Sequence, residues 1–347
     1  MRQYLLPEKG NFYKANMHMH TTVSDGCWTP EQAKEEYKKR GYSIMAYTDH
    51  EVMIPHDELN DENFLTILST EIAVNAPWSE KGFWYVPTYH INIYAKDPHE
   101  TVNPLFTEEK VFPKSREFVT DEMRKIHYER HYSVEAMNEM IATANKAGFL
   151  VSYNHPFWSI QNYEDYIGLE GVWGVELANY GCFRLGYQLD NSMQPIDDLL
   201  KKDKRVFPLA TDDAHNPPDC FGGFVVVKAD KLEYHTVMGA LERGDFYASL
   251  GPSIDELYIE DGIVHLSCSE ARLVSLTTEC RFASVRGDNF DKTVTSAAFD
   301  INKYLELSRD ATKKGLPFKP YFRITVQDKE GRTAHTRAYF VDELKAD

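Results

Sequence analysis

The chain has 347 residues, 42% of them hydrophobic, and a formal net charge of −16. This length allows a sizeable core and predicts two domains. The acidic excess excludes an extended nucleic-acid-binding surface, because phosphate backbones are bound by clustered Lys and Arg. A small phosphorylated substrate stays compatible, since bound divalent cations reverse the local field of a pocket.

Seven strands are predicted in the N-terminal part of the chain. Several of them are short apolar runs without alternation, which is typical of strands buried on both faces. They cover residues 16–20, 43–50, 64–71, 90–95, 149–155, 172–179 and 206–213.

Amphipathic helical segments lie between these strands. A capping-box pattern with a proline at the first helical position begins a helix at Thr29 that ends at Gly41. Ser133 begins a second helix that stops at Gly148, and a third covers 230–244. The alternation predicts an α/β fold with a parallel sheet or barrel over residues 1–252.

Two regions depart from this alternation. Residues 96–132 are charged, contain prolines and are weakly periodic, which predicts an excursion over the barrel mouth that could act as a lid. After residue 252 the pattern changes to turn-separated strands of β-branched and aromatic residues. We expect a small all-β, sandwich-like domain at 253–347 with a helical insertion near 301–314, and its strand edges would permit a homo-oligomer.

Metal-ligand types gather at the ends of the predicted strands. His18 and His20 close the first strand and, being two residues apart, point to the same face. The other candidates lie at strand ends or in the loops that follow: Asp25, His50, Glu71, His90, His155, Asp213 and His215. In a βα barrel the carboxyl ends of all strands converge on one face, so one shared site is predicted. Imidazole with carboxylate suits Zn, Mn or Fe, and nine ligands exceed the need of one ion, so we expect two or three divalent ions bridged by Glu71.

Each of these residues also has an ordinary structural explanation. A lone histidine at a strand end is more often a capping or core group than a ligand. His90 stands in an aromatic stretch at the start of its strand, and Asp25 could be a turn residue. Asp49, beside His50, is interpreted as a structural residue. Their joint occurrence at nearly every predicted strand favours the metal site.

The motifs HMHTTVSDG, TDH, the glutamate of STEI, YHINIY, NHP and DDAH occur in this order. Together they resemble the motifs of the PHP (polymerase and histidinol phosphatase) superfamily over the N-terminal two-thirds of the chain. YASLGPSI, followed by a compact β region, is similar to the CehA/McbA-like branch. The resemblance implies a distorted (β/α)7 barrel.

The resemblance also implies an assignment of ligands. It places His18, His20, Glu71 and Asp213 on a first ion. Glu71, His90 and His155 would hold a second ion, and Asp25, His50 and His215 a third. Asp25 stands where some relatives carry histidine. Glu176 matches a glutamate of this branch, which implies a contact with substrate or with a ligand.

These features predict a metal-dependent hydrolase, with phosphoester hydrolysis of a small monoester or diester favoured. The alternatives are carboxyl-ester, carbamate or amide hydrolysis, and a non-catalytic metal-binding module. Asp213 and Glu71 are the expected catalytic residues, with His215 as one candidate for protonating the leaving group. Arg184 could contact an anionic substrate group, although an ordinary surface arginine explains it as well.

The cysteines and the N-terminus bear on location. Five cysteines are widely spaced without a CxxC pair, which favours free thiols in a reducing compartment over disulfides or structural zinc. The first residues lack the apolar run of a signal peptide, and no later stretch could span a bilayer. We therefore expect a cytoplasmic protein without membrane contact.

Overall fold

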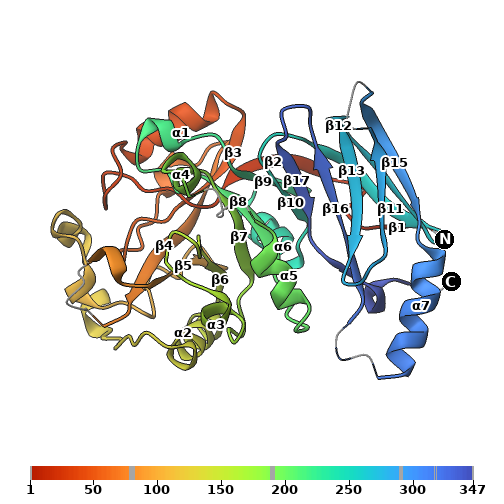
Figure 1. Cartoon of the computed structure of the whole chain (residues 1–347). Helices are drawn as coiled ribbons and strands as arrows, with labels where there is room; N and C mark the ends of the chain where they lie inside the picture. The colour runs from red at the N-terminus through yellow and green to blue at the C-terminus, as the bar shows by residue number, and fades with distance from the viewer. Residues whose placement is uncertain are drawn as a thin grey trace.

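The computed structural model describes residues 2–77, 83–187, 192–288, 292–315, 317 and 319–345. Figure 1 shows a mixed α/β part, coloured red to green, beside a β part coloured blue. One large sheet runs through both parts, and a second, four-stranded sheet lies at the far side of the β part. None of the described helices is long and apolar enough to cross a lipid bilayer.

Seven neighbouring strands of the large sheet form the mixed α/β part. They are β2 (Asn11–Asn16), β3 (Tyr42–Tyr47), β4 (Leu65–Asn75), β5 (Thr88–Ala95), β6 (Phe149–Tyr153), β7 (Gly174–Asn179) and β8 (Phe207–Thr211). Beyond the ends of β2 and β8, the two edges of this series meet through a parallel bridge between Met19 and Ala214. The fold is therefore α/β with a large sheet, while the seven-stranded barrel stays a prediction.

The expectation of a parallel sheet is wrong for β5, which runs antiparallel to both β4 and β6. The reason is local: β4 continues past Glu71 to Asn75, and the chain then returns in a hairpin arrangement instead of crossing over through a helix. The predicted strand 16–20 is also shifted. Regular pairing ends at Asn16, and His18 to His20 lie in an extended segment beyond it.

Helices border these strands as the caps predicted. Helix α1 (Pro30–Lys38) has the expected capping box at Thr29, and α2 (Val134–Lys146) begins after Ser133. The third helix starts later than expected, as α6 (Tyr234–Arg243), and ends at Gly244 in the left-handed conformation. The remaining short helices are α3 (Tyr163–Tyr166), α4 (Tyr180–Arg184) and α5 (Gln194–Leu200).

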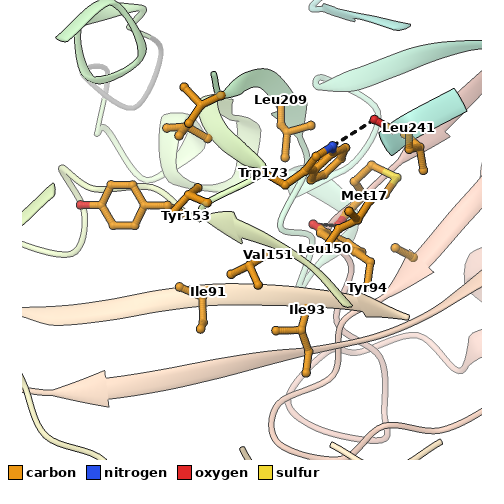
Figure 2. Close-up of a cluster of buried hydrophobic side chains, with 14 of the residues drawn as sticks. Met17, Ile91, Ile93, Tyr94, Leu150, Val151, Tyr153, Trp173, Leu209 and Leu241 are labelled. Carbon is orange, nitrogen blue, oxygen red and sulfur yellow. Dashed lines mark hydrogen bonds between the residues drawn. The ribbon is translucent and has the colours of Figure 1, made fainter. Parts of the chain in front are cut away.

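A core of aliphatic and aromatic side chains fixes the strands relative to one another. Figure 2 shows Ile91 and Ile93 of β5 and Val151 of β6 within this core. The Trp173 indole N–H donates to the backbone oxygen of Leu241, 3.0 Å away, so the one polar atom of this large ring is satisfied. Packing of these buried side chains fixes the positions of the strands, and therefore of the candidate ligands that the strands and their following loops carry.

The excursion at 96–132 contains three short 3-10 helices: Glu108–Lys110, Pro113–Phe118 and Met123–Lys125. It has a small apolar cluster of its own, in which Phe106, Val111 and Met123 pack against Val23 and Val52. Val23 and Val52 come from the loops that carry the candidate ligands Asp25 and His50. The excursion thus lies against the mouth of the site, as the sequence predicted.

The large sheet continues from β2 through β9 (Phe224–Ala229) and β10 (Phe246–Ser249), which connect the two parts. In the β part, the large sheet contains β17 (Thr333–Thr336), β16 (Tyr321–Gln327), β13 (Leu273–Thr278), β14 (Ala283–Gly287) and β18 (Tyr339–Phe340). The second sheet contains β1 (Gln3–Tyr4), β11 (Ile254–Glu260), β12 (Ile263–Ala271) and β15 (Val294–Asp300). Side chains of both sheets share one core, and the expected helical insertion is α7 (Asn302–Lys313).

Candidate metal centre

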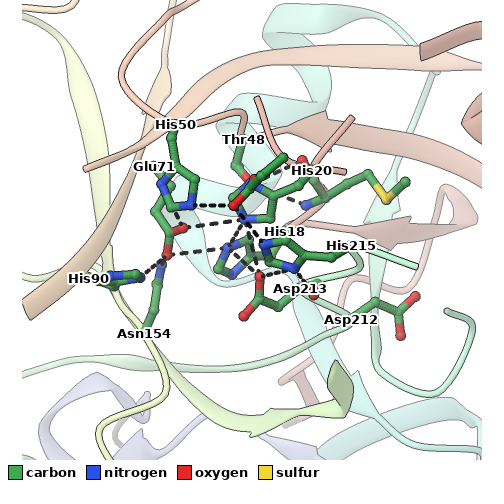
Figure 3. A network of polar contacts seen from close by, with 12 residues as sticks. His18, His20, Thr48, His50, Glu71, His90, Asn154, Asp212, Asp213 and His215 are labelled. Carbon is green, nitrogen blue, oxygen red and sulfur yellow. Dashed lines mark hydrogen bonds and ion pairs between the residues drawn. The ribbon is translucent and has the colours of Figure 1, made fainter. Parts of the chain in front are cut away.

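The nine candidate ligands lie together, and Figure 3 labels seven of them: His18, His20, His50, Glu71, His90, Asp213 and His215. Glu71 and His90 lie within β4 and β5, and the others lie in segments that follow strands. His18 and His20 follow β2, and Met19 between them is buried in the opposite direction, within the core. The alternation of an extended chain therefore turns both imidazoles toward the same side. His90 reaches this side from the start of β5, because that strand runs in the reverse direction.

Among the described residues, the ligand atoms form three overlapping groups. The first is His18, His20, Glu71 and Asp213; the second is Glu71, His90 and His155; the third is His20, Asp25, His50 and His215. Two of these sets match those implied by the PHP resemblance. The third contains His20 in addition, so this imidazole lies between two groups as Glu71 does.

The spacing within the first group suits a shared ion. The two Nε2 atoms of His18 and His20 are 3.1 Å apart, and each lies 3.3 Å from an oxygen of Glu71. Asp213 Oδ1 is 3.2 Å from one imidazole and 3.1 Å from the other. Four ligands at bonding distance around a tetrahedral ion are separated by about 3.4 Å. These residues therefore fit a divalent ion.

Asp213 gives a second reason for that fit. Its Oδ1 atom is buried and has no hydrogen-bond donor among the described residues. A carboxylate oxygen buried without a partner is costly, and a cation would satisfy it. The backbone at Asp213 and His155 has φ values of 48° and 24°, which is rare for residues other than glycine. Such strain persists where the surrounding structure enforces it, as at functional sites.

Glu71 is the central carboxylate of the site. It is 1% exposed, and its Oε1 lies 3.0 Å from His90 Nδ1 and 3.4 Å from His155 Nε2. Its Oε2 faces His20 on the other side. One carboxylate thus faces two groups, which is the geometry expected of a bridging ligand.

The third group lies nearest to solvent. Asp25 Oδ2 is 3.5 Å from His215 Nε2 and 3.6 Å from His50 Nε2. The side chains of Asp25 and His215 are both 32% exposed, whereas those of His18 and His20 are fully buried. An ion held here would therefore exchange with solvent more readily than one in the first group.

Glu176 is buried behind His18 and does not line the cavity described below. The Nδ1 atom of His18 lies 2.7 Å from its Oε1, and Thr211 donates a further hydrogen bond of 2.7 Å. A carboxylate in this position fixes the tautomer and orientation of a ligand imidazole. The contact with a ligand implied by the resemblance is present, and the placement does not support contact with substrate.

Three supporting residues were missed in the sequence. Asn154 donates to Glu71 Oε1 at 3.1 Å, and Asn179 donates to both Glu176 and Asp213 at 3.0 Å. Asp212 accepts three successive backbone N–H groups of residues 221–223 and so holds the loop that follows His215. For Asn154 and Asp212 the signal was a polar residue directly beside a candidate ligand, in NHP and DDAH, whereas Asn179, in GVELAN, stands beside none.

The charges of the site are mutually stabilised. Burial lowers the pKa of His20, but the neighbouring carboxylates of Asp213 and Glu71 outweigh this and raise it to about 10. For His155, burial again lowers the pKa, but Glu71 and Asp213 outweigh it and raise the pKa to about 9. Burial and the nearby His20 lower the pKa of His50 to about 3. Since imidazoles bind metals in the neutral form, ion binding here would release protons.

A cavity of about 640 Å³ opens above these groups. Seven of the nine candidate ligands line it, together with Lys110 and Phe112 of the excursion. Arg184 lies on α4, is exposed and is not part of this lining. Its placement favours the ordinary surface interpretation.

Comparisons with known proteins give only distant likenesses. No protein-family model matches the chain, and no curated protein does. Among solved structures, a two-domain protein from Bacteroides vulgatus containing a predicted PHP-like metal-dependent phosphoesterase is 15% identical, with a TM-score of 0.42, covering 97% of this chain and 98% of that one. A protein from Bifidobacterium adolescentis described as a metal-dependent phosphoesterase is 18% identical, with a TM-score of 0.37 and coverages of 61% and 90%. An amidohydrolase from Chromobacterium violaceum, solved with sulfate and no metal, is 13% identical, with a TM-score of 0.40 and coverages of 67% and 96%.

Proposed function

We propose that the chain is a PHP-like metal-dependent phosphoesterase, which hydrolyses a small phosphomonoester or phosphodiester. The observation that carries this proposal is the convergence of nine histidine and carboxylate side chains into three overlapping groups. The motif resemblance to the PHP superfamily, and to its CehA/McbA-like branch, supports it. All nine residues lie within 1–252, which we propose as the catalytic domain, with 253–347 as a β domain.

The donor set suits two or three ions of Zn, Mn or Fe. Such ions lower the pKa of a water molecule to near neutrality and stabilise negative charge on phosphoryl oxygens. In the overall reaction, water oxygen bonds to phosphorus, the bond from phosphorus to the leaving oxygen breaks, and the alcohol leaves with a proton from that water.

The residues of the chain supply position and proton transfer. Glu71, in β4, belongs to the first and second groups and so connects them, and Asp213, just beyond β8, completes the first. Glu176 fixes the direction of His18. His215 is the half-buried imidazole at the solvent side, where a leaving group would depart. Where two ions fill the first and second groups and the third group holds none, we propose His215 as the residue that protonates the leaving oxygen.

The test is hydrolysis of matched aryl phosphomonoester, phosphodiester and carboxyl-ester substrates by the Mn²⁺- or Zn²⁺-loaded protein. Asp213→Ala and His155→Ala should lose activity by at least about a thousandfold while circular dichroism stays unchanged, because each removes a ligand of the centre. Asp230→Ala, at an exposed position, is the matched control and should keep full activity.

Each outcome decides between the alternatives. Phosphate release that is lost in both variants supports the phosphoesterase. Cleavage of the carboxyl ester alone would assign the chain to the carbonyl hydrolases. Full activity in either variant would remove the assigned ligands from the mechanism, and metal binding without any turnover would favour the binding module.

A further inference from the structure

Two aromatic side chains stand on different sides of the metal centre. The ring of Phe112, from the excursion, stacks on His50 with centroids 5.3 Å apart and planes 26° apart. Trp158, in the loop after β6, stands edge-on to His155 at 5.1 Å and lies 5.4 Å from His90. Both rings line the cavity, and neither is fully buried. Each therefore offers apolar surface to a bound molecule.

The charged residues of the cavity restrict what else can bind. Apart from the ligand carboxylates, its acidic residues are Glu51 and Asp219. Glu51 is neutralised by a bidentate pair with Arg130, with both distances 2.6 Å. Asp219 accepts a hydrogen bond from the backbone N–H of Asn216 at 2.9 Å. Lys110 is the one Lys or Arg among the described lining residues. A substrate with much negative charge beyond its phosphoryl group would thus be poorly matched.

We propose that the site selects phosphate esters whose leaving group is a flat, apolar ring, packed against Phe112 and Trp158. This inference rests on the proposed function and names its substrate class. A cavity of about 640 Å³ accommodates a molecule of that size. Aromatic rings add packing energy beyond the area that they bury, so the two side chains would act as specificity residues.

The experiment compares benzyl phosphate with ethyl phosphate, whose leaving alcohols have similar acidity. We expect the metal-loaded protein to prefer benzyl phosphate by about tenfold or more in kcat/KM, the discrimination that a hydrophobic pocket provides. Phe112→Ala and Trp158→Leu should reduce the ratio of kcat/KM for benzyl phosphate to kcat/KM for ethyl phosphate severalfold, mainly through the KM of benzyl phosphate. Phe183→Ala, an exposed aromatic outside the cavity, should leave the preference unchanged.

Equal use of both esters by the unaltered protein, or a preference that persists in both variants, would overturn the inference. If neither ester is hydrolysed, the proposed function is contradicted, but the inference about the ring is still tested by binding. Calorimetry then measures the affinity of the metal-loaded protein for benzylphosphonate and for ethylphosphonate. Tighter binding of benzylphosphonate that is lost in the Phe112 and Trp158 variants would still support the ring site. Equal binding of the two phosphonates would reject it.

Discussion

Asp49 holds the loop that carries Asp25 through four hydrogen bonds. Its carboxylate accepts the backbone N–H and hydroxyl of Thr21 at 2.8 and 2.7 Å, and those of Ser24 at 3.0 and 2.7 Å. Asp49 itself is 3% exposed and is not a member of any ligand group. The position of Asp25 therefore depends on a carboxylate that lies outside the candidate ligand groups.

Asp49→Asn should weaken metal binding at the third group. The amide nitrogen cannot accept a hydrogen bond, so at least one of the four contacts is lost and Asp25 is held less firmly. Loss of such outer contacts typically lowers metal affinity by about 10- to 100-fold. A Mn²⁺ titration followed by calorimetry or electron paramagnetic resonance should show one weakened site with the others unchanged. Asp57→Asn, at an exposed position, is the control, and equal affinities in both variants would contradict the argument.

At this scale, the sequence pointed to candidate ligands, because that role follows from the chemistry of the residue itself. Histidines and carboxylates at strand ends indicate ligands without knowledge of any partner. Asn154 and Asn179 could not be assigned in this way, because their roles depend on Glu71 and Asp213, which are brought close only by the fold. A side-chain amide in a sequence does not show which carboxylate it will meet.

At the scale of elements, strand direction was the main feature that the sequence did not reveal. A run such as HINIYA predicts a strand, but nothing within it fixes whether the strand runs parallel to its neighbours. The antiparallel pairing of β5 brings His90 into the candidate site, because it places the first part of that strand beside Glu71 of β4. The prediction that His90 belongs to the cluster was made from its residue type, its place at the start of a predicted strand and the YHINIY motif, without knowledge of the strand direction.

The excursion is fastened to the α/β part by Arg130. This side chain is 3% exposed, forms the bidentate pair with Glu51 and also donates to the backbone oxygens of Leu105 and Ala73. Glu51 directly follows the candidate ligand His50. The pair thus links the covering segment to the metal centre.

Arg130→Met should lower the free energy of unfolding by about 3 kcal/mol, because it leaves the buried Glu51 charge without a partner. Urea denaturation followed by fluorescence measures this change. Adding Glu51→Gln should recover part of the loss by removing the charge. Arg124→Met removes only exposed ion pairs and should cost less than about 1 kcal/mol. Similar stabilities of the two arginine variants would show that the buried pair does not fasten the excursion.

At the scale of the whole molecule, the large sheet passes from the α/β part into the β part without interruption. β10 pairs with β17, and the guanidinium of Arg323 in β16 contacts Asp197 of α5 at 3.0 and 2.7 Å. The sequence predicted the change of character after residue 252 but not this continuity, because pairing between strands about 90 residues apart leaves no local signal. The boundary at 252 therefore stays a prediction.

His335 lies at this junction, in β17 between β10 and β16, where it is 9% exposed. Its ring nitrogens contact only the hydroxyls of Thr325 and Thr333 at 3.2 and 2.9 Å among the described residues. Burial, helped by the nearby Arg323, lowers its pKa to about 3. In the unfolded chain the imidazole has an ordinary pKa near 6.5, so below that pH the unfolded state binds a proton that the folded state does not.

Stability should therefore fall as the pH drops from about 6.5 toward 3, with His335 contributing about 2 kcal/mol of that loss by pH 5. His335→Gln keeps a polar side chain that does not titrate, so its free energy of unfolding should decline less steeply over the same range. Urea denaturation at pH 7, 6 and 5 gives the slope of the free energy of unfolding against pH for each protein. The titration of the candidate metal centre is common to both proteins, so it cancels in the difference between the two slopes. His235→Gln, at an exposed position of α6, should follow the unaltered protein. Parallel slopes for the His335 variant and the unaltered protein would contradict the prediction, because they would mean that this imidazole is protonated in the folded state as well. The strand junction would then have to accommodate a buried charge beside Arg323.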